Sequence, residues 1–331
     1  MPIVVAEQLS KTYRVSDRAP GLAGAIRHLF NRRHRSIEAL RSVSFSIEPG
    51  EVVGFLGPNG AGKTTALKLL TGLMHPTSGR AEVAGHTPFR RQRDFLERIT
   101  LVMGHKQQLI WDLPAIDSLR INAAVYDLPD PVFRQRLDEL RTLLEMGDEL
   151  RQPVRKLSLG QRMKAELIAA LLHRPSVLFL DEPTLGLDVN AQAGVRQFLQ
   201  EYNRAHGAAI LLTSHYMADI TALCRRVIVI HQGSLMYDGD LDDLVRRYAP
   251  AREVKLEFQQ PISRERLQAY GEVESCEGRV ASLIVPRESL TRIVQRLLDE
   301  TDVCDLEVKD PPIEKVIGRL FRDGAQTGAQ P

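Results

Sequence analysis

A glycine-rich segment at residues 57–65, GPNGAGKTT, has the residue types and spacing that bind phosphate. It fits the pattern G-x-x-x-x-G-K-[S/T], in which glycines let backbone N–H groups curl around phosphate oxygens. Lys63 adds a positive charge at the outer phosphates, and the Thr64 hydroxyl can bind Mg²⁺. A chance match is the alternative, but the loop lies between an apolar strand and a helix whose positive end points at the same anions. The predicted nucleotide-binding residues are Gly57, Pro58, Asn59, Gly60, Ala61, Gly62, Lys63, Thr64 and Thr65.

Two adjacent carboxylates follow a second apolar strand in the segment SVLFLDEP, residues 176–183. Because successive side chains of a strand point in opposite directions, Asp181 can reach a magnesium ion while Glu182 faces elsewhere. Glu182 is then the candidate to polarise an attacking water. A solvated strand end would explain an isolated acidic pair, but the phosphate-binding loop upstream favours a functional one. A carboxylate directly after the metal ligand suits hydrolysis better than phosphoryl transfer to a metabolite.

The segment LSLGQR at residues 157–162 narrows the choice among P-loop ATPases. It resembles the LSGGQ signature of ABC ATPases: Ser158, Gly160 and Gln161 match, and Leu159 replaces the third-position glycine. The resemblance implies that this turn faces the terminal phosphate held by a partner subunit, so that two chains share each site. Ser158 would also cap the following helix on simpler grounds. Both interpretations hold together, because a helix N-terminus is also an anion site.

The resemblance to ABC ATPases covers roughly residues 1–245 and implies roles for three further residues. Asp188, in LGLD, is similar to the aspartate that communicates across the dimer. His215, in TSH, follows an apolar strand and is implied to contact the terminal phosphate and assist hydrolysis. Tyr13, in LSKTYR, is similar to the aromatic residue that stacks on adenine, although an isolated tyrosine more often serves packing.

Two segments depart from the family pattern. The glutamine that links the metal site to the membrane partner should fall near position 105, where MGHKQQLIWDLP has His105 instead. The imidazole of His105 can hydrogen-bond a metal-bound water and could take the place of the glutamine. Gln107 and Gln108 follow closely, so the sequence does not decide which residue links the metal site to the membrane partner. The second departure is a basic insertion at about residues 16–37, which either contacts anionic lipid or the membrane subunit as an amphipathic element or forms a solvated loop. Its apolar and basic residues are Leu22, Ile26, Leu29, Phe30, Arg32, Arg33, His34 and Arg35.

Apolar strands alternate with helices around these motifs, which predicts a mostly parallel sheet covered on both faces. Residues 43–56 favour two strands around Pro49-Gly50, and the segment RVIVIHQGSLMYDG favours a hairpin that turns at Gln232-Gly233. The predicted fold class is α/β, a P-loop NTPase core of ABC type. For this core the resemblance implies an antiparallel β portion and a helical signature subdomain.

The pattern changes near Tyr248, which separates a nucleotide-binding domain at 1–247 from a small domain at 251–323. The second region favours the order strand, helix, strand, strand, helix, strand and a last helix. This order predicts an α+β, ferredoxin-like domain. The tail, residues 324–331, is predicted to be disordered.

The amino-acid composition limits the classes of protein that fit this sequence. Of 331 residues, 43% are apolar and 26% are charged, which is the balance of a globular protein with a sizeable core. Lys and Arg total 44 against 42 Asp and Glu, so the overall charge does not steer the chain toward nucleic acid. The cysteines Cys224, Cys276 and Cys304 lack metal-ligand spacing and fit reduced thiols in the cytoplasm. No run of about 18 apolar residues occurs, so we expect no membrane span.

Together these motifs predict the ATP-binding and ATP-hydrolysing subunit of an ABC transporter. The resemblance implies ATP and Mg²⁺ as cofactors, a homodimer or a heterodimer with another ABC ATPase subunit, and separate transmembrane permease subunits. The chain would lie in the cytoplasm, peripheral on the inner face of the cell membrane through the permease. A finer resemblance is to ATP-binding subunits of bacterial exporters that have a separate six-helix membrane subunit. It rests on three segments: the basic insertion, QQLIWDLP and the ending DPPIEKVIGRLF.

Three other classes stay open at this point. A soluble ABC ATPase that acts on nucleic acid or ribosomes is the main alternative, but coiled-coil insertions, zinc cysteines and a second ATPase domain, which that class usually carries, do not occur in the sequence. A small-molecule P-loop kinase conflicts with LSLGQ and lacks a recognisable acceptor-binding lid. A purely regulatory binding module requires that Glu182 is not catalytic.

Overall fold

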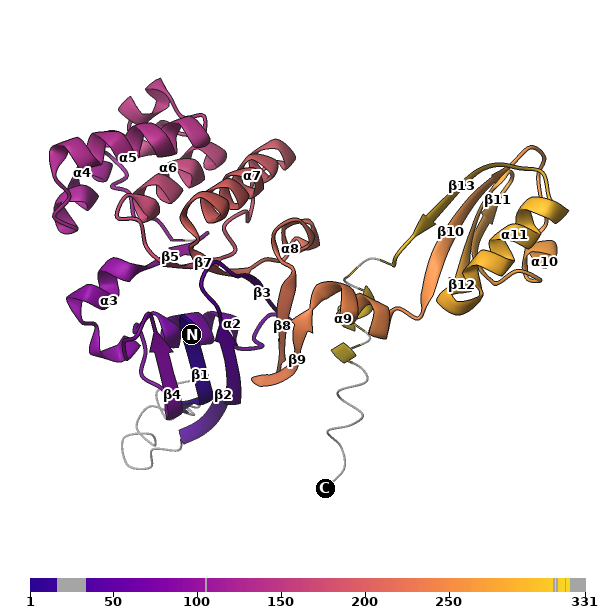
Figure 1. The fold of residues 1–331 in the computed structure, drawn as a ribbon, viewed down its shortest axis with the longest axis horizontal. Coiled ribbons are helices and arrows are strands. Elements are labelled where there is room, and N and C mark those ends of the chain that lie inside the picture. Colours follow the sequence, from indigo (N-terminus) through magenta and orange to yellow (C-terminus); the bar gives the residue numbers. More distant parts are fainter. Residues whose placement is uncertain (17–33, 105, 312, 314, 319, 322–331) are drawn as a thin grey trace, which may run out of the picture. The chain divides into compact units, whose positions relative to one another are not determined.

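The computed structural model forms two compact units, Met1–Gly239 and Asp240–Pro331 (Figure 1). The residues that the structure describes are 1–16, 34–104, 106–311, 313, 315–318 and 320–321. Most of the basic insertion and the predicted disordered tail lie outside these residues. The contacts divide the chain before α9 (Leu241–Tyr248), whereas the sequence divides it after this segment, so the domain limits at 247 and 251 stay predictions.

An antiparallel three-stranded sheet forms one layer of the first unit (Figure 1). Its strands, in the order β2-β1-β4, are β1 (Val4–Ser16), β2 (His34–Ile47) and β4 (Ser78–Val83). Val4 and Ala6 of β1 are buried while Glu7 is exposed, as expected for a sheet with one face on the core. This sheet is the predicted antiparallel portion, and its pairing sets Tyr13 opposite Ile37.

A six-stranded sheet forms the second layer. Its strands, in the order β5-β6-β7-β3-β8-β9, are β3 (Val52–Leu56), β5 (Ile99–Met103), β6 (Val177–Asp181), β7 (Ala209–Thr213), β8 (Arg226–His231) and β9 (Ser234–Asp240). The five strands from β5 to β8 in this order pair in parallel, which confirms the predicted sheet. The predicted hairpin joins β8 to β9 through Gln232 and Gly233, with φ of 48° and 80°. Two successive left-handed residues are typical of a tight hairpin turn.

Helices cover both faces of the six-stranded sheet. The helices of the first unit are α2 (Lys63–Leu70), α3 (Arg93–Arg98), α4 (Ala115–Val125), α5 (Asp130–Leu143), α6 (Leu159–Leu171), α7 (Val189–His206) and α8 (Met217–Leu223). Leu67 of α2 shares a core with Phe55 of β3 on one face. Gly54 points to the opposite face, where a Cβ atom would lie 3.3 Å from the side chain of Ile220 in α8.

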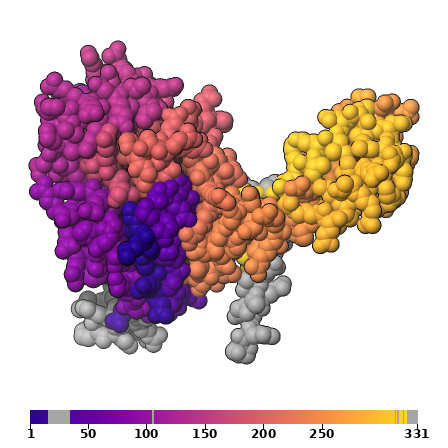
Figure 2. Space-filling view, viewed as in Figure 1, coloured from indigo at the N-terminus to yellow at the C-terminus, as the bar shows by residue number. Residues whose placement is uncertain are grey.

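Helices α4, α5 and α6 form a group of their own within the first unit, drawn in magenta in Figures 1 and 2. Helix α6 packs against both α4 and α5 and also against β5. Short 3₁₀ turns at Asp148–Arg151 and Val154–Lys156 lead into it. Because α6 begins directly after Ser158, this group corresponds to the predicted helical signature subdomain.

The second unit holds a four-stranded antiparallel sheet in the order β11-β12-β10-β13. After α9 its elements are β10 (Ala251–Phe258), α10 (Arg264–Leu267), β11 (Glu272–Glu277), β12 (Val280–Pro286), α11 (Leu290–Glu300) and β13 (Val303–Lys309). Val254, Leu256 and Phe258 of β10 pack in one core with Leu297 of α11. From β10 to β13 the order of strands and helices is the predicted one and agrees with a split βαβ motif. Of the predicted last helix at 312–321, the structure describes 313, 315–318 and 320–321, which are helical. The designation ferredoxin-like stays a prediction.

The three cysteines are free, with Cys224 buried, Cys276 half-buried and Cys304 exposed. Among the described residues, no helix combines the length and the apolar character that crossing a membrane requires. Within the same part of the chain, no three His, Cys, Asp or Glu side chains gather in a way that could hold a metal ion.

We expect His173 to make the stability of the protein depend on pH. Its ring stacks on Tyr126 with centroids 3.9 Å apart, and its Nε2 lies 3.0 Å from the carbonyl oxygen of Ile99. Burial lowers the pKa of His173 to about 4. Because the unfolded chain binds this proton near pH 6.5, the neutral ring stabilises the fold above pH 6.5, and about 3 kcal/mol is lost as the pH falls to 4. His173→Phe should keep the stacking and flatten this dependence, measured by chemical denaturation at pH 7 and pH 4.5.

The exposed residue His75 provides the matched control, because His75→Phe removes an imidazole that water already solvates. That variant should lose stability on acidification as the wild type does. An equal loss in His173→Phe would show that other groups cause the dependence.

Candidate functional site

The predicted site residues gather where the carboxyl ends of the parallel strands meet. The phosphate-binding loop joins β3 to α2, Asp181 ends β6, and His215 lies two residues after β7. In open α/β sheets, ligands bind at this edge. The edge therefore brings the loop, the acidic pair and His215 together from distant parts of the sequence.

The backbone of the loop passes so close to neighbouring chain that two positions require glycine. At Gly57 a Cβ atom would lie 2.2 Å from the carbonyl oxygen of Ile230, and at Gly62 it would lie 2.4 Å from that of Ala39. Both residues have positive φ, 154° and 110°, which other residues rarely adopt. A Cβ at Gly60, by contrast, would meet nothing within 4 Å, so the tip of the loop is open to a ligand.

Lys63 lies beneath this loop and is only 7% exposed. Its Nζ donates to the carbonyl oxygens of Gly57 at 2.6 Å and Pro58 at 3.1 Å. Burial lowers the pKa of Lys63, and the charges of Glu182 and Asp181 oppose that change. A buried ammonium held by neutral carbonyls is poised to exchange them for an anion, since hydrogen bonds between ionised groups are stronger.

Asp181 connects the loop to the strand ends. Its Oδ2 accepts from the Thr64 hydroxyl at 2.9 Å, and its Oδ1 accepts from the Thr213 hydroxyl at 2.7 Å. A hydroxyl and a carboxylate side by side are oxygen ligands of the kind Mg²⁺ takes, with the remaining positions filled by water and phosphate. Thr64 and Asp181 therefore fit the predicted ion. The sequence did not single out Thr213, whose only signal is its position two residues before His215.

Glu182 turns away from Asp181 and toward His215, with Oε1 2.8 Å from Nε2 of the imidazole. Glu182 has a left-handed backbone, φ 55°, and its N–H donates to the carbonyl oxygen of Thr213 at 3.1 Å. A Cβ at Gly104 would lie 2.1 Å from the carbonyl oxygen of Glu182, so a glycine is required at the end of β5. The two carboxylates contact different partners, as strand alternation predicts. The cause is the strained turn at Glu182, however, and not the alternation of a strand.

Tyr13 reaches the start of α2 from β1. Its hydroxyl lies 3.4 Å from that of Thr65 and donates to Sδ of Met74 at 3.1 Å. Lys11 Nζ lies 5.6 Å from the centre of the same ring. The ring is half-buried beside the phosphate-binding helix. This position is compatible with both the stacking and the packing interpretations.

Ser158 caps α6 through a reciprocal pair of hydrogen bonds with Gln161. Its hydroxyl accepts from the Gln161 N–H at 3.2 Å, and its own N–H donates to Gln161 Oε1 at 3.0 Å. Leu159, which replaces the glycine, is 43% exposed. Asp188 likewise caps α7 and accepts from the N–H of Ala191 at 2.9 Å. Within one chain, Ser158 and Asp188 therefore act as helix caps, and the predicted contact of this turn with the phosphate of a partner subunit stays a prediction.

His105, the predicted coupling position, lies outside the described residues. Gln107 is exposed, and Gln108 donates from Nε2 to the carbonyl oxygen of Leu101 at 3.2 Å. The Gln108 N–H also donates to the Glu166 carboxylate at 3.0 Å. Glu166 is 3% exposed, and burial raises its pKa. This anchor is not predictable from the sequence, because α6 also carries Gln161, Arg162 and Lys164, and nothing in the pattern sets Glu166 apart from them.

A phosphate-binding loop before a helix, with a buried aspartate on the loop threonine, defines a P-loop nucleotide-binding protein. A family model described as "ABC transporter" matches residues 40–185, and one described as "EvrA-like ABC transporter, C-terminal domain" matches residues 250–309. Two ATP-binding proteins of transporters are more than 30% identical to this chain over 87% and 73% of their own lengths. The chain belongs to the ABC transporter ATP-binding proteins, and it is an ATPase of that type.

Individual relatives support this assignment. The ABC transporter ATP-binding protein NatA of Bacillus subtilis is 35% identical over 215 residues, which are 65% of this chain and 87% of NatA. The bacitracin transport ATP-binding protein BcrA of Bacillus licheniformis is 31% identical over 228 residues, 69% of this chain and 73% of BcrA. The solved structure of an ATP-binding subunit of an ABC transporter matches with a TM-score of 0.61 and 26% identity, over 74% of this chain and 93% of that one.

Proposed function

We propose that this chain closes with a second ABC ATPase subunit around ATP, reopens on hydrolysis, and thereby drives export through a separate membrane permease. The observation that carries the proposal is the contact between Glu182 and His215 beside the Asp181–Thr64 pair at the end of the phosphate-binding loop. Transport is supported by the similarity to BcrA, whose name assigns it to bacitracin transport. The outward direction rests on the resemblance of QQLIWDLP and DPPIEKVIGRLF to bacterial exporter subunits. Identical and different partner subunits both fit.

In this proposal the loop residues 57–65 hold the phosphates of ATP, with Lys63 at the outer ones. Thr64 and Asp181 would ligate Mg²⁺, which would neutralise charge on the phosphate oxygens. Tyr13 would stack on the adenine from the side of Thr65. The close contact of Asp181 with the Thr64 and Thr213 hydroxyls supports this assignment, since both hold the carboxylate at the loop.

In the proposed reaction, Glu182 accepts a proton from the water that attacks the γ-phosphorus of ATP. The bond between this phosphorus and the bridging oxygen breaks, and its electron pair leaves with ADP. The products are ADP, inorganic phosphate and a proton. His215 holds the Glu182 carboxylate from one side and is 40% exposed, so it can also meet the terminal phosphate.

The partner subunit would supply the turn from Ser158 to Gln161. This turn opens α6, a helix of 13 residues, and the free N–H groups of a first helical turn attract anions. Asp188 would communicate across the same interface. The permease would place the pair at the inner face of the membrane. Contact of the basic insertion with anionic lipid stays a prediction, and of its arginines only Arg35, exposed on β2, lies among the described residues.

Cross-linking tests the shared site directly. Asn59→Cys and Leu159→Cys would be combined in a chain whose three cysteines are replaced by Ala, with Glu182→Gln to retain ATP. Both positions are exposed in the single chain. Mild oxidation should produce a disulfide-linked dimer in the presence of Mg-ATP and little without nucleotide, measured on a non-reducing gel.

Val125 offers the matched control, because it is 69% exposed but lies at the end of α4. Asn59→Cys paired with Val125→Cys should give no ATP-dependent dimer. Equal cross-linking of both pairs, or of the Asn59–Leu159 pair without nucleotide, would contradict the proposed closure.

A further inference from the structure

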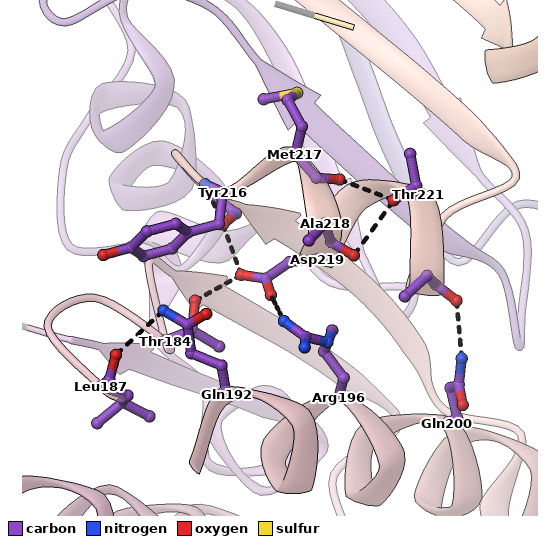
Figure 3. Close-up of polar contacts among 12 residues, drawn as sticks. Thr184, Leu187, Gln192, Arg196, Gln200, Tyr216, Met217, Ala218, Asp219 and Thr221 are labelled. Atoms are coloured by element: carbon purple, nitrogen blue, oxygen red, sulfur yellow. Dashed lines mark hydrogen bonds and ion pairs between the residues drawn. The ribbon is translucent and has the colours of Figure 1, made fainter. Parts of the chain in front are cut away.

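A buried carboxylate, that of Asp219 in α8, lies beside both turns that carry the proposed catalytic pair (Figure 3). Its Oδ2 accepts from the hydroxyls of Thr184 at 2.5 Å and Ser214 at 2.7 Å. Its Oδ1 accepts from Nη1 of Arg196 at 2.8 Å. Asp219 is 0% exposed. A buried ionised carboxylate is tolerated only with such partners, so these three contacts hold one another in place.

Each of the three donors belongs to a segment of the proposed site. Thr184 follows Glu182 by two residues, and Ser214 directly precedes His215. Arg196 lies on α7, the helix that Asp188 caps. The carboxylate of Asp219 therefore holds three segments: the turn that carries Glu182, the turn that carries His215, and α7.

Local backbone contacts make this arrangement stiff. The Tyr216 N–H donates to the Ser214 hydroxyl at 3.0 Å, and the Asp219 N–H donates to the Tyr216 carbonyl oxygen at 3.0 Å. Gln192 of α7 also donates to the carbonyl oxygen of Leu187 at 3.2 Å, which ties the segment before Asp188 to the same helix (Figure 3). Hydrogen bonds therefore join the three segments to one another.

We propose that Asp219 is a positioning residue for ATP hydrolysis. It sets the placement of Glu182 relative to His215 and links that placement to the position of α7 at the proposed dimer interface. This inference rests on the proposed function, since it assumes that Glu182 and His215 act on ATP. It predicts a loss of turnover without a loss of nucleotide binding, because Asp219 reaches the site only through its neighbours.

Thr184→Val tests the proposal with the smallest change, since valine keeps the shape and removes one hydroxyl donor. With the chain assembled in its complex, kcat should fall at least about 10-fold, because one hydrogen bond to a charged group is lost and the carboxylate is left under-satisfied. KM for ATP, and the ATP-dependent Asn59–Leu159 cross-link, should stay unchanged. Thr184→Ser should restore kcat, because it restores the donor.

Thr221→Val is the matched control. Thr221 lies on the same helix, but its hydroxyl donates to the carbonyl oxygens of Met217 and Ala218 and not to Asp219 (Figure 3). This variant should turn over ATP at the wild-type rate. Asp219→Asn should lower kcat further than Thr184→Val. If Asp219→Asn does not fold, the comparison of Thr184→Val with Thr184→Ser and Thr221→Val still tests the positioning role.

Wild-type kcat in Thr184→Val, an equal loss in Thr221→Val, or no recovery in Thr184→Ser would overturn the positioning role. If the wild type hydrolyses ATP, Glu182→Gln does not and Thr184→Val is normal, only this inference fails. If wild-type turnover is indifferent to Glu182, the proposed function fails first and the inference fails with it.

Discussion

Replacing Glu182 by glutamine should lower ATP turnover at least about 100-fold, the smallest effect usual for removal of a general base. Glutamine keeps the size of the side chain, and its amide can still hydrogen-bond His215, but it cannot accept the proton of water. The variant should therefore bind ATP normally and accumulate as a closed, ATP-loaded dimer. Phosphate release measures the first effect, and size-exclusion chromatography with Mg-ATP measures the second.

The control is Glu201→Gln on α7, where the carboxylate accepts from Gln197 in the same helix at 2.9 Å. It should leave turnover and dimerisation unchanged. Normal turnover in Glu182→Gln would assign the base to another residue and would return the regulatory binding module as the interpretation of this chain. A loss of ATP binding in the same variant would instead place Glu182 among the phosphate-binding residues.

The phosphate-binding loop could be predicted from the sequence because all of its information is local. Nine consecutive residues specify the turn, and the apolar segments on either side specify a strand and a helix. The pairing of Thr64 with Asp181 follows from the same logic, because parallel strands bring their carboxyl ends to one edge of a sheet. The order of the elements along the chain is enough to predict this pairing.

The orientation of Glu182 depends on contacts with other strands, which the order of the elements does not predict. Strand alternation predicts that Glu182 and Asp181 point apart, but Glu182 lies beyond β6 in a left-handed turn, φ 55°, where alternation does not apply. This strain is tolerated because the Thr213 carbonyl oxygen accepts from Glu182 and because Gly104 has no Cβ. Neither condition is readable from the acidic pair, since both neighbours come from other strands.

The Asp219 network could not be predicted at all. Asp219 is 35 residues from Thr184 and 23 from Arg196, and in the segment MADITAL it looks like an ordinary acidic residue of a first helical turn. Its partners are a threonine and a serine in loops and an arginine on α7, and the sequence indicates no shared role for the three. Such a buried cluster is specified by packing between elements, which a one-dimensional pattern does not contain.

Replacing Lys63 by alanine should weaken ATP binding about 10- to 100-fold, because a hydrogen bond to a charged group contributes about 1.5–3 kcal/mol. The stability of the nucleotide-free protein should change much less. Burial lowers the pKa of Lys63, which means that the fold disfavours the ammonium until an anion arrives. Isothermal titration with a non-hydrolysable ATP analogue gives the affinity, and thermal unfolding with and without nucleotide gives the stability.

Lys68→Ala separates this effect from a general loss of positive charge. Lys68 lies in the last turn of the same helix, whereas Lys63 begins that helix under the loop. Its loss should leave the affinity for ATP unchanged and remove only a favourable charge at the helix C-terminus. Equal affinity in Lys63→Ala and the wild type would mean that backbone N–H groups alone hold the phosphates. A large loss of nucleotide-free stability would mean instead that the ammonium serves mainly to hold the Gly57 and Pro58 carbonyls, and the weaker binding would then follow from a damaged loop.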